Sequence, residues 1–388
     1  MTGEPTPAAS PAEHVEHVGS LVRPPWLEGA ALGVTRGRLG PDQLRLLQDR
    51  AVSEALARQA AAGLAVVTDG ELRRVPLLVA PSEDAGSWQG GWAGPLVPHV
   101  HDEELVALGA HGGSRPQPGD GSAGGQAGAA GGQAGAPAPT VLEEHRFACD
   151  HTRRPVKISL LGAERAAQSL VPLIGGARTH DGFAELVAEV VRNERALISG
   201  LVADGCRHVQ LDVPGYAGYE NPVRWAARRG HGIDPLADLQ LSIGADNAVV
   251  AGTEGVTFGL HVCRRGEQGR WRAAISNDQV AETMMSQLRF DRLLLDFGYD
   301  EPRFEQLRFI PKGLTVVLGL VSTTNDRVET SDELMARIDE ASAHIDVDQL
   351  AIGPSCGFAG AIGHRDVSET SQWRKLDALM ETAERVWG

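Results

Sequence analysis

The sequence predicts an α/β protein folded as a single (β/α)8 barrel, and three observations lead to this prediction. Short apolar runs alternate with amphipathic stretches of helical period along most of the 388-residue chain. No glycine-rich GxGxxG turn follows the first run, which disfavours an open doubly wound sheet. Polar residues gather where the apolar runs end, and barrel enzymes place their chemistry there. The eight runs expected to form strands are residues 16–22, 64–68, 155–161, 207–213, 256–262, 291–296, 314–320 and 347–352.

Two stretches fall outside this alternation. Residues 1–13 are rich in Pro, Ala and Glu and are expected to form a disordered tail, which leaves residues 14–388 for one catalytic barrel. An excursion at residues 85–150 follows the second strand and contains a flexible segment at residues 110–139. That segment is nearly all Gly, Ala, Gln, Pro and Ser, which cannot bury enough apolar surface to order the backbone.

Composition excludes several classes of protein. The net charge of −15 argues against a nucleic-acid partner, which needs a basic surface. No apolar run approaches the roughly 20 residues that cross a bilayer, and the N-terminus lacks a basic-then-apolar signal pattern. We therefore expect a cytoplasmic protein with no membrane partner. Four scattered cysteines are too few for a disulfide scaffold, so each is a packing residue or a ligand.

A histidine and a cysteine, both common metal ligands, end the fifth predicted strand. His261 and Cys263 are two positions apart, so their side chains point to the same face. Cys356 follows the eighth strand in GPSCGF, and Asp296 ends the sixth. Taken singly, such a histidine or cysteine is more often a core residue. Two thiols, an imidazole and a carboxylate at one barrel rim instead suit a tetrahedral Zn²⁺ site.

Other polar residues end the remaining strands. Asp212 ends the fourth strand and is either a site residue or the cap of a following helix or turn. Glu71 and Arg73 follow the second strand, where they are either site residues or an exposed ion pair. The further candidates are Ser20 and Arg23 after the first strand and Lys157 within the third.

Five motifs resemble the catalytic domain of cobalamin-independent methionine synthases, most closely the shorter, single-barrel members of that family. The resemblance covers nearly the whole chain except the tail and the Gly/Ala/Gln-rich segment. Its most specific parts are the HxC and PxCGF elements. The motifs are HVGSLVRP (17–24), VTDGELRR (67–74), GLHVCRRGE (259–267), VVLGLVSTTNDRVETSDELMARIDEA (316–341) and DQLAIGPSCGFA (348–359).

The resemblance implies a catalytic zinc held by His261, Cys263 and Cys356, with an acidic fourth ligand at the end of the sixth strand. The family usually has glutamate at that place. This chain has Asp296, which is one methylene shorter, followed closely by Asp300 and Glu301.

The resemblance also assigns substrate contacts. Ser20, Glu71 and Asp212 match residues that hold the amino-acid end of homocysteine, and the carboxylates of Glu71 and Asp212 are the expected catalytic pair. A carboxylate pair is suited to an ammonium group. Three basic residues either neutralise an anionic part of the substrate or stabilise the rim: Arg23, Arg73 and Lys157.

The expected reaction is alkyl transfer to sulfur, because zinc lowers the pKa of a bound thiol and two thiolate ligands leave its sulfur electron-rich. Methyl transfer to homocysteine or a related small thiol is the leading case, with a folate, a corrinoid or another electrophile as donor. The stretch Val321–Thr324 lacks the histidine that full-length members place there to protonate folate, which disfavours folate. Alternatives are an enzyme resembling epoxide:coenzyme M transferases, a C–S bond-forming or bond-cleaving enzyme, and a non-catalytic zinc-binding barrel.

Overall fold

The parallel strands of this chain follow one another around the sheet in sequence order. The structure, a computed structural model, describes residues 9–74, 141–170, 180–213, 216, 219, 222–230, 233–262, 278–297, 304–359 and 366–388. Within these residues a six-stranded parallel sheet has the order β1-β2-β3-β4-β5-β6. The strands are β1 (Lys157–Leu161), β2 (His208–Asp212), β3 (Thr257–Val262), β4 (Arg292–Asp296), β5 (Thr315–Val321) and β6 (Leu350–Pro354).

Two extended segments near the N-terminus join the two edges of this sheet. Val15 bridges Ile352 of β6, and Val67 bridges Val156 beside β1, both in the parallel sense. The two segments also contact each other, because the backbone N–H of Leu21 donates to the Gly70 carbonyl at 3.0 Å. The chain is therefore a (β/α)8-type barrel, as the alternating pattern predicts, although its first two strands each contribute a single bridge.

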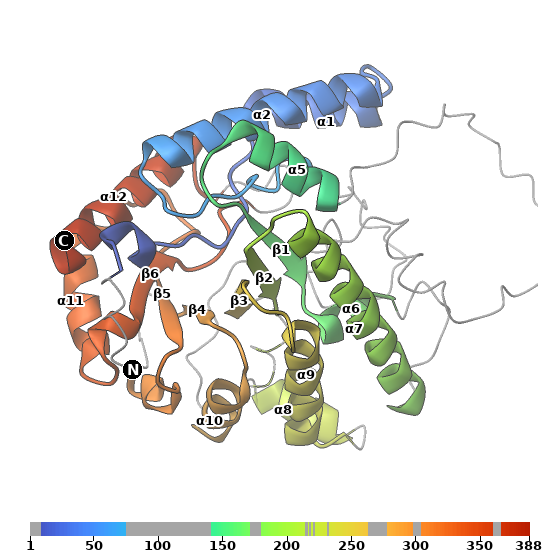
Figure 1. Cartoon of the computed structure of the whole chain (residues 1–388), viewed down its shortest axis with the longest axis vertical. Helices are drawn as coiled ribbons and strands as arrows, with labels where there is room; N and C mark the ends of the chain where they lie inside the picture. The colour runs from blue at the N-terminus through green and yellow to red at the C-terminus, as the bar shows by residue number, and fades with distance from the viewer. Residues whose placement is uncertain are drawn as a thin grey trace, which may run out of the picture.

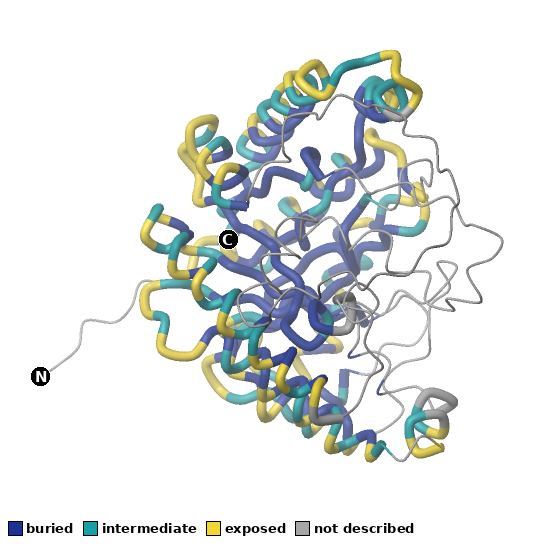
Figure 2. Tube along the Cα trace, turned by 90° about the vertical axis from the view of Figure 1, so that its right-hand side faces the viewer, coloured by how far each residue is buried: buried dark blue, intermediate teal, exposed yellow. Residues whose placement is uncertain are grey.

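Helices surround the strands, as Figure 1 shows. The amphipathic stretches between apolar runs form them, burying one face on the sheet. Figure 2 shows the buried chain at the centre and the exposed chain along the helices. The helices are α1 (Pro25–Thr35), α2 (Pro41–Ala61), α5 (Val141–His151), α6 (Ala163–Leu170), α7 (His180–Ala203), α8 (Pro222–Gly230), α9 (Pro235–Val250), α10 (Asp278–Gln287), α11 (Ser331–Ser342) and α12 (Glu369–Trp387), with 3-10 helices η1 (Pro11–His14), η5 (Phe304–Phe309) and η6 (Val347–Gln349).

A small apolar cluster lies inside the barrel, separate from the large core beneath the helices. It contains Val18, Leu294, Val317 and Ala351. Leu294 pairs in register with Val317, and Val317 pairs with Ala351. On the strands, the residues next to them in sequence face the helices and belong to the large core. The alternation of side chains along each strand therefore separates the cluster inside the barrel from the core beneath the helices.

A buried ionic network lies inside the barrel and is joined to Asp212 of the candidate site through Gln210. The Lys157 ammonium group donates to Glu16 Oε1, the His17 carbonyl and Gln210 Oε1, each at 2.7 Å. Arg292 contacts the second Glu16 oxygen at 2.5 Å. The ammonium group has three N–H donors, and these contacts use all of them. This arrangement favours a structural role for Lys157 over the substrate contact suggested by the resemblance.

Two parts of the chain are more ordered than their composition indicates. The predicted tail includes residues 11–13, yet these residues belong to η1, where Glu13 accepts hydrogen bonds from Ser10. His14 stacks on Trp387 with ring centroids 4.3 Å apart, which ties this segment to α12. Residues 141–150 of the predicted excursion form most of α5, which buries Val141, Glu144, His145 and Ala148. Residues 11–13 and 141–150 therefore have regular structure, which contacts with remote parts of the chain stabilise.

Two further expectations concern the whole chain. The segment at residues 110–139, which its composition predicts to be flexible, lies outside the described residues. Among the described helices, none is long and apolar enough to span a membrane.

Candidate active site

The predicted site residues lie at the carboxyl ends of the barrel strands. Asp212 ends β2, His261 lies near the end of β3 and Asp296 ends β4. Cys356 follows β6 by two residues. All four side chains are buried, and Asp212 is paired in register with His261. Parallel strands bring these ends to one rim, which explains how residues 144 positions apart in the sequence share one site.

A chain of hydrogen bonds fixes the orientation of His261. Its Nδ1 atom lies 3.0 Å from Asp212 Oδ1. The same oxygen accepts a hydrogen bond from Gln210 Nε2 at 2.8 Å. Gln210 is buried on the same face of β2 as Asp212, two residues earlier. Because an ionised carboxylate only accepts hydrogen bonds, the Nδ1–H of His261 donates to Asp212, and Nε2 is directed away from Asp212.

The other nitrogen of His261 is the atom that fits a metal ion. Nε2 is buried and has no hydrogen-bond partner among the described residues. Burial lowers the pKa of His261, but the hydrogen bond with Asp212 and the proximity of the Asp212 and Cys356 side chains outweigh this effect and raise the pKa to about 10. Asp212 and Cys356 thus favour a positive charge at the imidazole, carried either by a proton or by a metal ion that replaces the proton on Nε2. A metal-bound histidine commonly donates its other ring N–H to a carboxylate in this way.

The metal site cannot be completed from the described residues alone. Within the described ranges, no group of three or more His, Cys, Asp or Glu side chains is placed to hold a metal ion. Cys263, the ligand expected beside His261, lies outside those ranges. Asp296 is buried at the end of β4, where it pairs in register with Gly319. Its direct coordination therefore stays a prediction.

Ser20 is held against the loop that carries Cys356. The Ser20 carbonyl accepts a hydrogen bond from the backbone N–H of Phe358 at 3.0 Å. A Cβ atom at Gly357 would lie 2.0 Å from Ser20 Oγ, so a side chain at position 357 would displace the serine hydroxyl. The absence of a side chain at this glycine thus lets the first and last strand ends approach closely.

Glu71 occupies a strained backbone position beside these strand ends. Its φ of 56° is in the left-handed region, which non-glycine residues rarely adopt. The Glu71 N–H donates to Asp69 Oδ1 at 2.9 Å, which holds the turn. Burial raises the pKa of Glu71 to about 8; Arg74 opposes the increase, whereas Asp212 adds to it. Strain of this kind concentrates at functional sites.

Two of the predicted basic site residues support the Glu71 turn from outside. Arg23 donates to the carbonyls of Glu71 and Arg74 at 3.3 and 2.6 Å. Arg73 pairs with Asp49 of α2 at 2.5 Å, and its guanidinium lies 3.7 Å from the centre of the Phe147 ring on α5. These contacts favour a structural role for both arginines.

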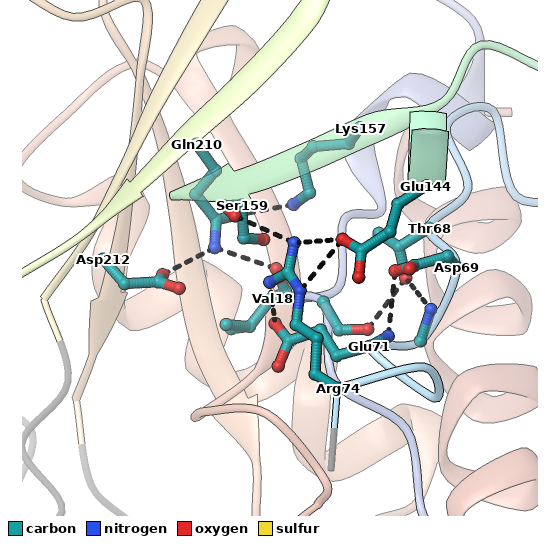
Figure 3. Close-up of polar contacts among 12 residues, drawn as sticks. Val18, Thr68, Asp69, Glu71, Arg74, Glu144, Lys157, Ser159, Gln210 and Asp212 are labelled. Atoms are coloured by element: carbon teal, nitrogen blue, oxygen red, sulfur yellow. Dashed lines mark hydrogen bonds and ion pairs between the residues drawn. The ribbon is translucent and has the colours of Figure 1, made fainter. Parts of the chain in front are cut away.

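Three residues of this network, which Figure 3 shows, were not predicted from the sequence. Gln210 was detectable, because it alternates onto the same face as Asp212 in HVQLD. Arg74 was visible within VTDGELRR, but nothing in the sequence indicated its partner. Glu144 carried no signal, since it belongs to a stretch predicted to be irregular. The Glu144 and Arg74 side chains form hydrogen bonds of 3.0 and 3.1 Å.

The fold and the site together define a class of protein: a (β/α)8 barrel with an oriented imidazole, a thiol and carboxylates at its strand ends. The model of the family described as "Cobalamin-independent synthase, Catalytic domain" matches residues 184–376, about half of the chain. The chain belongs to the cobalamin-independent methionine synthase family. This membership supports methyl transfer to a thiol as the general reaction.

Individual relatives agree with this assignment. The chain is 27% identical to the uncharacterized protein YxjG of Bacillus subtilis over 413 residues, covering 100% of both chains. It is 26% identical to a methionine synthase of Pyrococcus abyssi over 227 residues, covering 57% of this chain and 56% of the relative. A crystal structure titled as a putative vitamin-B12 independent methionine synthase from Listeria monocytogenes has the same fold. Its TM-score is 0.66 at 20% identity, over 99% of this chain and 100% of that one.

Proposed function

We propose that this chain is a zinc-dependent enzyme that transfers a methyl group to the sulfur of homocysteine or a closely related aminothiol. The observation that carries the proposal is His261, whose Nδ1 is held by Asp212 while its buried Nε2 has no partner among the described residues. His261, Cys263, Cys356 and Asp296 are the proposed metal ligands. Zinc in such a set would lower the pKa of a substrate thiol and leave its sulfur nucleophilic.

The chain's own carboxylates suit the amino group of such a substrate. Glu71 and Asp212 lie close enough for the charge of Asp212 to raise the pKa of Glu71. An ammonium group placed between them would relieve this repulsion and donate hydrogen bonds to both carboxylates. Ser20, held by the Phe358 N–H, offers a hydroxyl to the substrate carboxylate.

The identity of the methyl donor is a separate part of the proposal. The segment after β5 contains Ser322, Thr323 and Thr324, and none of these side chains is an acid strong enough to protonate a folate nitrogen. Ser322 and Thr324 instead hydrogen-bond each other at 3.0 Å. A donor that needs no such proton, such as a methylated corrinoid, fits this segment better than a folate.

The test is zinc analysis followed by X-ray absorption at the zinc edge. We expect about one zinc per chain and one additional sulfur neighbour when L-homocysteine is added. Coenzyme M, a thiol with a sulfonate and no amino group, is the matched control and should leave the spectrum unchanged. A response to coenzyme M alone would favour the epoxide-opening alternative. Bound zinc that responds to no thiol would indicate a closed structural site, and absence of zinc would refute the proposal.

A further inference from the structure

Arg74 lies between the fully buried carboxylate of Glu144 and the partly exposed carboxylate of Glu71. Its Nε and Nη2 atoms donate to Glu144 Oε2 at 3.1 and 3.0 Å. Its Nη1 atom lies 3.7 Å from Glu71 Oε1. Figure 3 shows the guanidinium group between the two acids, beneath β1. Because one guanidinium contacts both, the strength of its contact with Glu144 affects the strength of its contact with Glu71.

Glu144 is placed unusually for a carboxylate. Its side chain is fully buried, and its Oε1 atom has no hydrogen-bond partner among the described residues. Burial raises the pKa of Glu144 to about 7, while Arg74 opposes this increase. A buried carboxylate with one oxygen unused costs stability, so packing alone does not explain glutamate at this position of α5. The negative charge of Glu144 is stabilised by its two hydrogen bonds from Arg74.

The contacts around Arg74 also orient it away from a close ion pair with Glu71. Nη2 donates to the Ser159 carbonyl of β1 at 3.3 Å as well as to Glu144. The Glu71 backbone is fixed separately through Asp69 and Arg23, so a closer ion pair requires a side chain to move, either the Arg74 guanidinium or the Glu71 carboxylate. As a result the guanidinium is within hydrogen-bonding distance of Glu144, whereas its separation from Glu71 exceeds that distance.

We propose that Glu144 is a positioning residue that restrains Arg74, so that the Glu71 carboxylate accepts the ammonium group of an aminothiol substrate. This inference rests on the proposed function and makes it more specific, because it concerns recognition of the substrate amino group. Without the charge on Glu144, Arg74 would form a close ion pair with Glu71. The arginine would then compete with the substrate ammonium for the same oxygens.

The test compares two thiols that differ only in the amino group. L-Homocysteine and 4-mercaptobutanoate are titrated calorimetrically into the zinc-loaded full chain and into Glu144→Gln. Loss of the Glu144 charge should weaken homocysteine binding about tenfold and leave 4-mercaptobutanoate within about twofold, so that discrimination between them shrinks. Glu143→Gln on the same helix is the matched control, because Glu143 is exposed, and it should leave both affinities unchanged.

Each other outcome has a defined meaning. Equal weakening of both thiols would show that Glu144 is merely structural, and an unchanged affinity for homocysteine would overturn the inference directly. If wild type binds neither thiol, the proposed function fails and the inference fails with it. Should Glu144→Gln not fold, Arg74→Lys replaces it, because lysine keeps the charge but cannot hold Glu144 through two N–H groups. The same selective loss for homocysteine is then required.

Discussion

The Nδ1 atom of His261 lies 3.0 Å from Oδ1 of Asp212, across the neighbouring strands β3 and β2. This contact fixes which imidazole nitrogen is left for a ligand. It also places a carboxylate at the rim, where the same side chain is expected to meet the substrate amino group. Asp212 therefore connects the proposed metal site to the proposed substrate site.

Replacing Asp212 with asparagine tests the first of these connections. Asparagine keeps the shape but removes the charge that stabilises the oriented imidazole. We expect zinc affinity to fall at least tenfold, since losses of this size are typical when a partner of a ligating histidine is changed. Competition with a chromophoric chelator measures the affinity. Asp278→Asn removes the same charge from an exposed position and should change nothing. Equal zinc affinities for wild type and Asp212→Asn would refute this role.

Cys356→Ser should lose most of the bound zinc, because a hydroxyl is a far weaker zinc ligand than a thiolate at neutral pH. Cys206→Ser is the control. Cys206 is buried near the start of β2, and burial raises its pKa to about 11, which disfavours the thiolate form. We expect the Cys206 variant to keep its zinc. The measurement is zinc per chain by atomic emission after desalting. Full zinc retention in Cys356→Ser would remove Cys356 from the site.

Asp296 is either a zinc ligand or a neighbour of the metal. If it is a ligand, Asp296→Glu should keep or tighten zinc binding by restoring the length of the family's usual glutamate. Asp296→Asn should weaken zinc binding by removing a charge. Chelator competition distinguishes these cases. A normal affinity in Asp296→Asn together with a loss in Glu305→Gln would place the acidic ligand after β4 rather than at its end.

The buried carboxylate of Asp246 on α9 predicts how the free energy of unfolding changes with pH. Burial raises the pKa of Asp246 on α9 to about 7, although hydrogen bonds from Tyr216 and the Ala163 N–H oppose the increase. Between the ordinary aspartate pKa and about 7, the folded state keeps a proton that the unfolded state releases. The contribution of Asp246 to stability is therefore lost as pH rises through this range.

Asp246→Asn should remove this dependence. Relative to wild type, the variant should gain about 2 kcal/mol of unfolding free energy between pH 5.5 and pH 8. Urea unfolding at the two pH values measures the change. Asp278→Asn, which alters an exposed carboxylate, should show no such gain. A difference between wild type and Asp246→Asn that does not vary with pH would contradict the prediction.

The sequence by itself determined the barrel and which of its polar residues lie at the strand ends. β1 to β4 lie within predicted apolar runs, while β5 and β6 extend one and two residues beyond theirs. Local periodicity carries this information, because each strand and helix must bury one face. Asp212, His261, Asp296 and Cys356 were predicted to lie together for the same reason, since parallel strands bring their carboxyl ends to one rim.

Only the tertiary structure decided which remote side chains meet. Arg74 and Glu144 are 70 residues apart, and Lys157 meets Glu16 across 141 residues. No local pattern encodes such pairs, because periodicity specifies the face of an element and not its partner. Glu144 was not predicted for this reason. The helix α5 was not predicted either, because its polar sequence is stabilised by contacts with segments remote in the sequence. The sequence therefore located the rim of the barrel, and the contacts between remote segments decided how its charges are arranged.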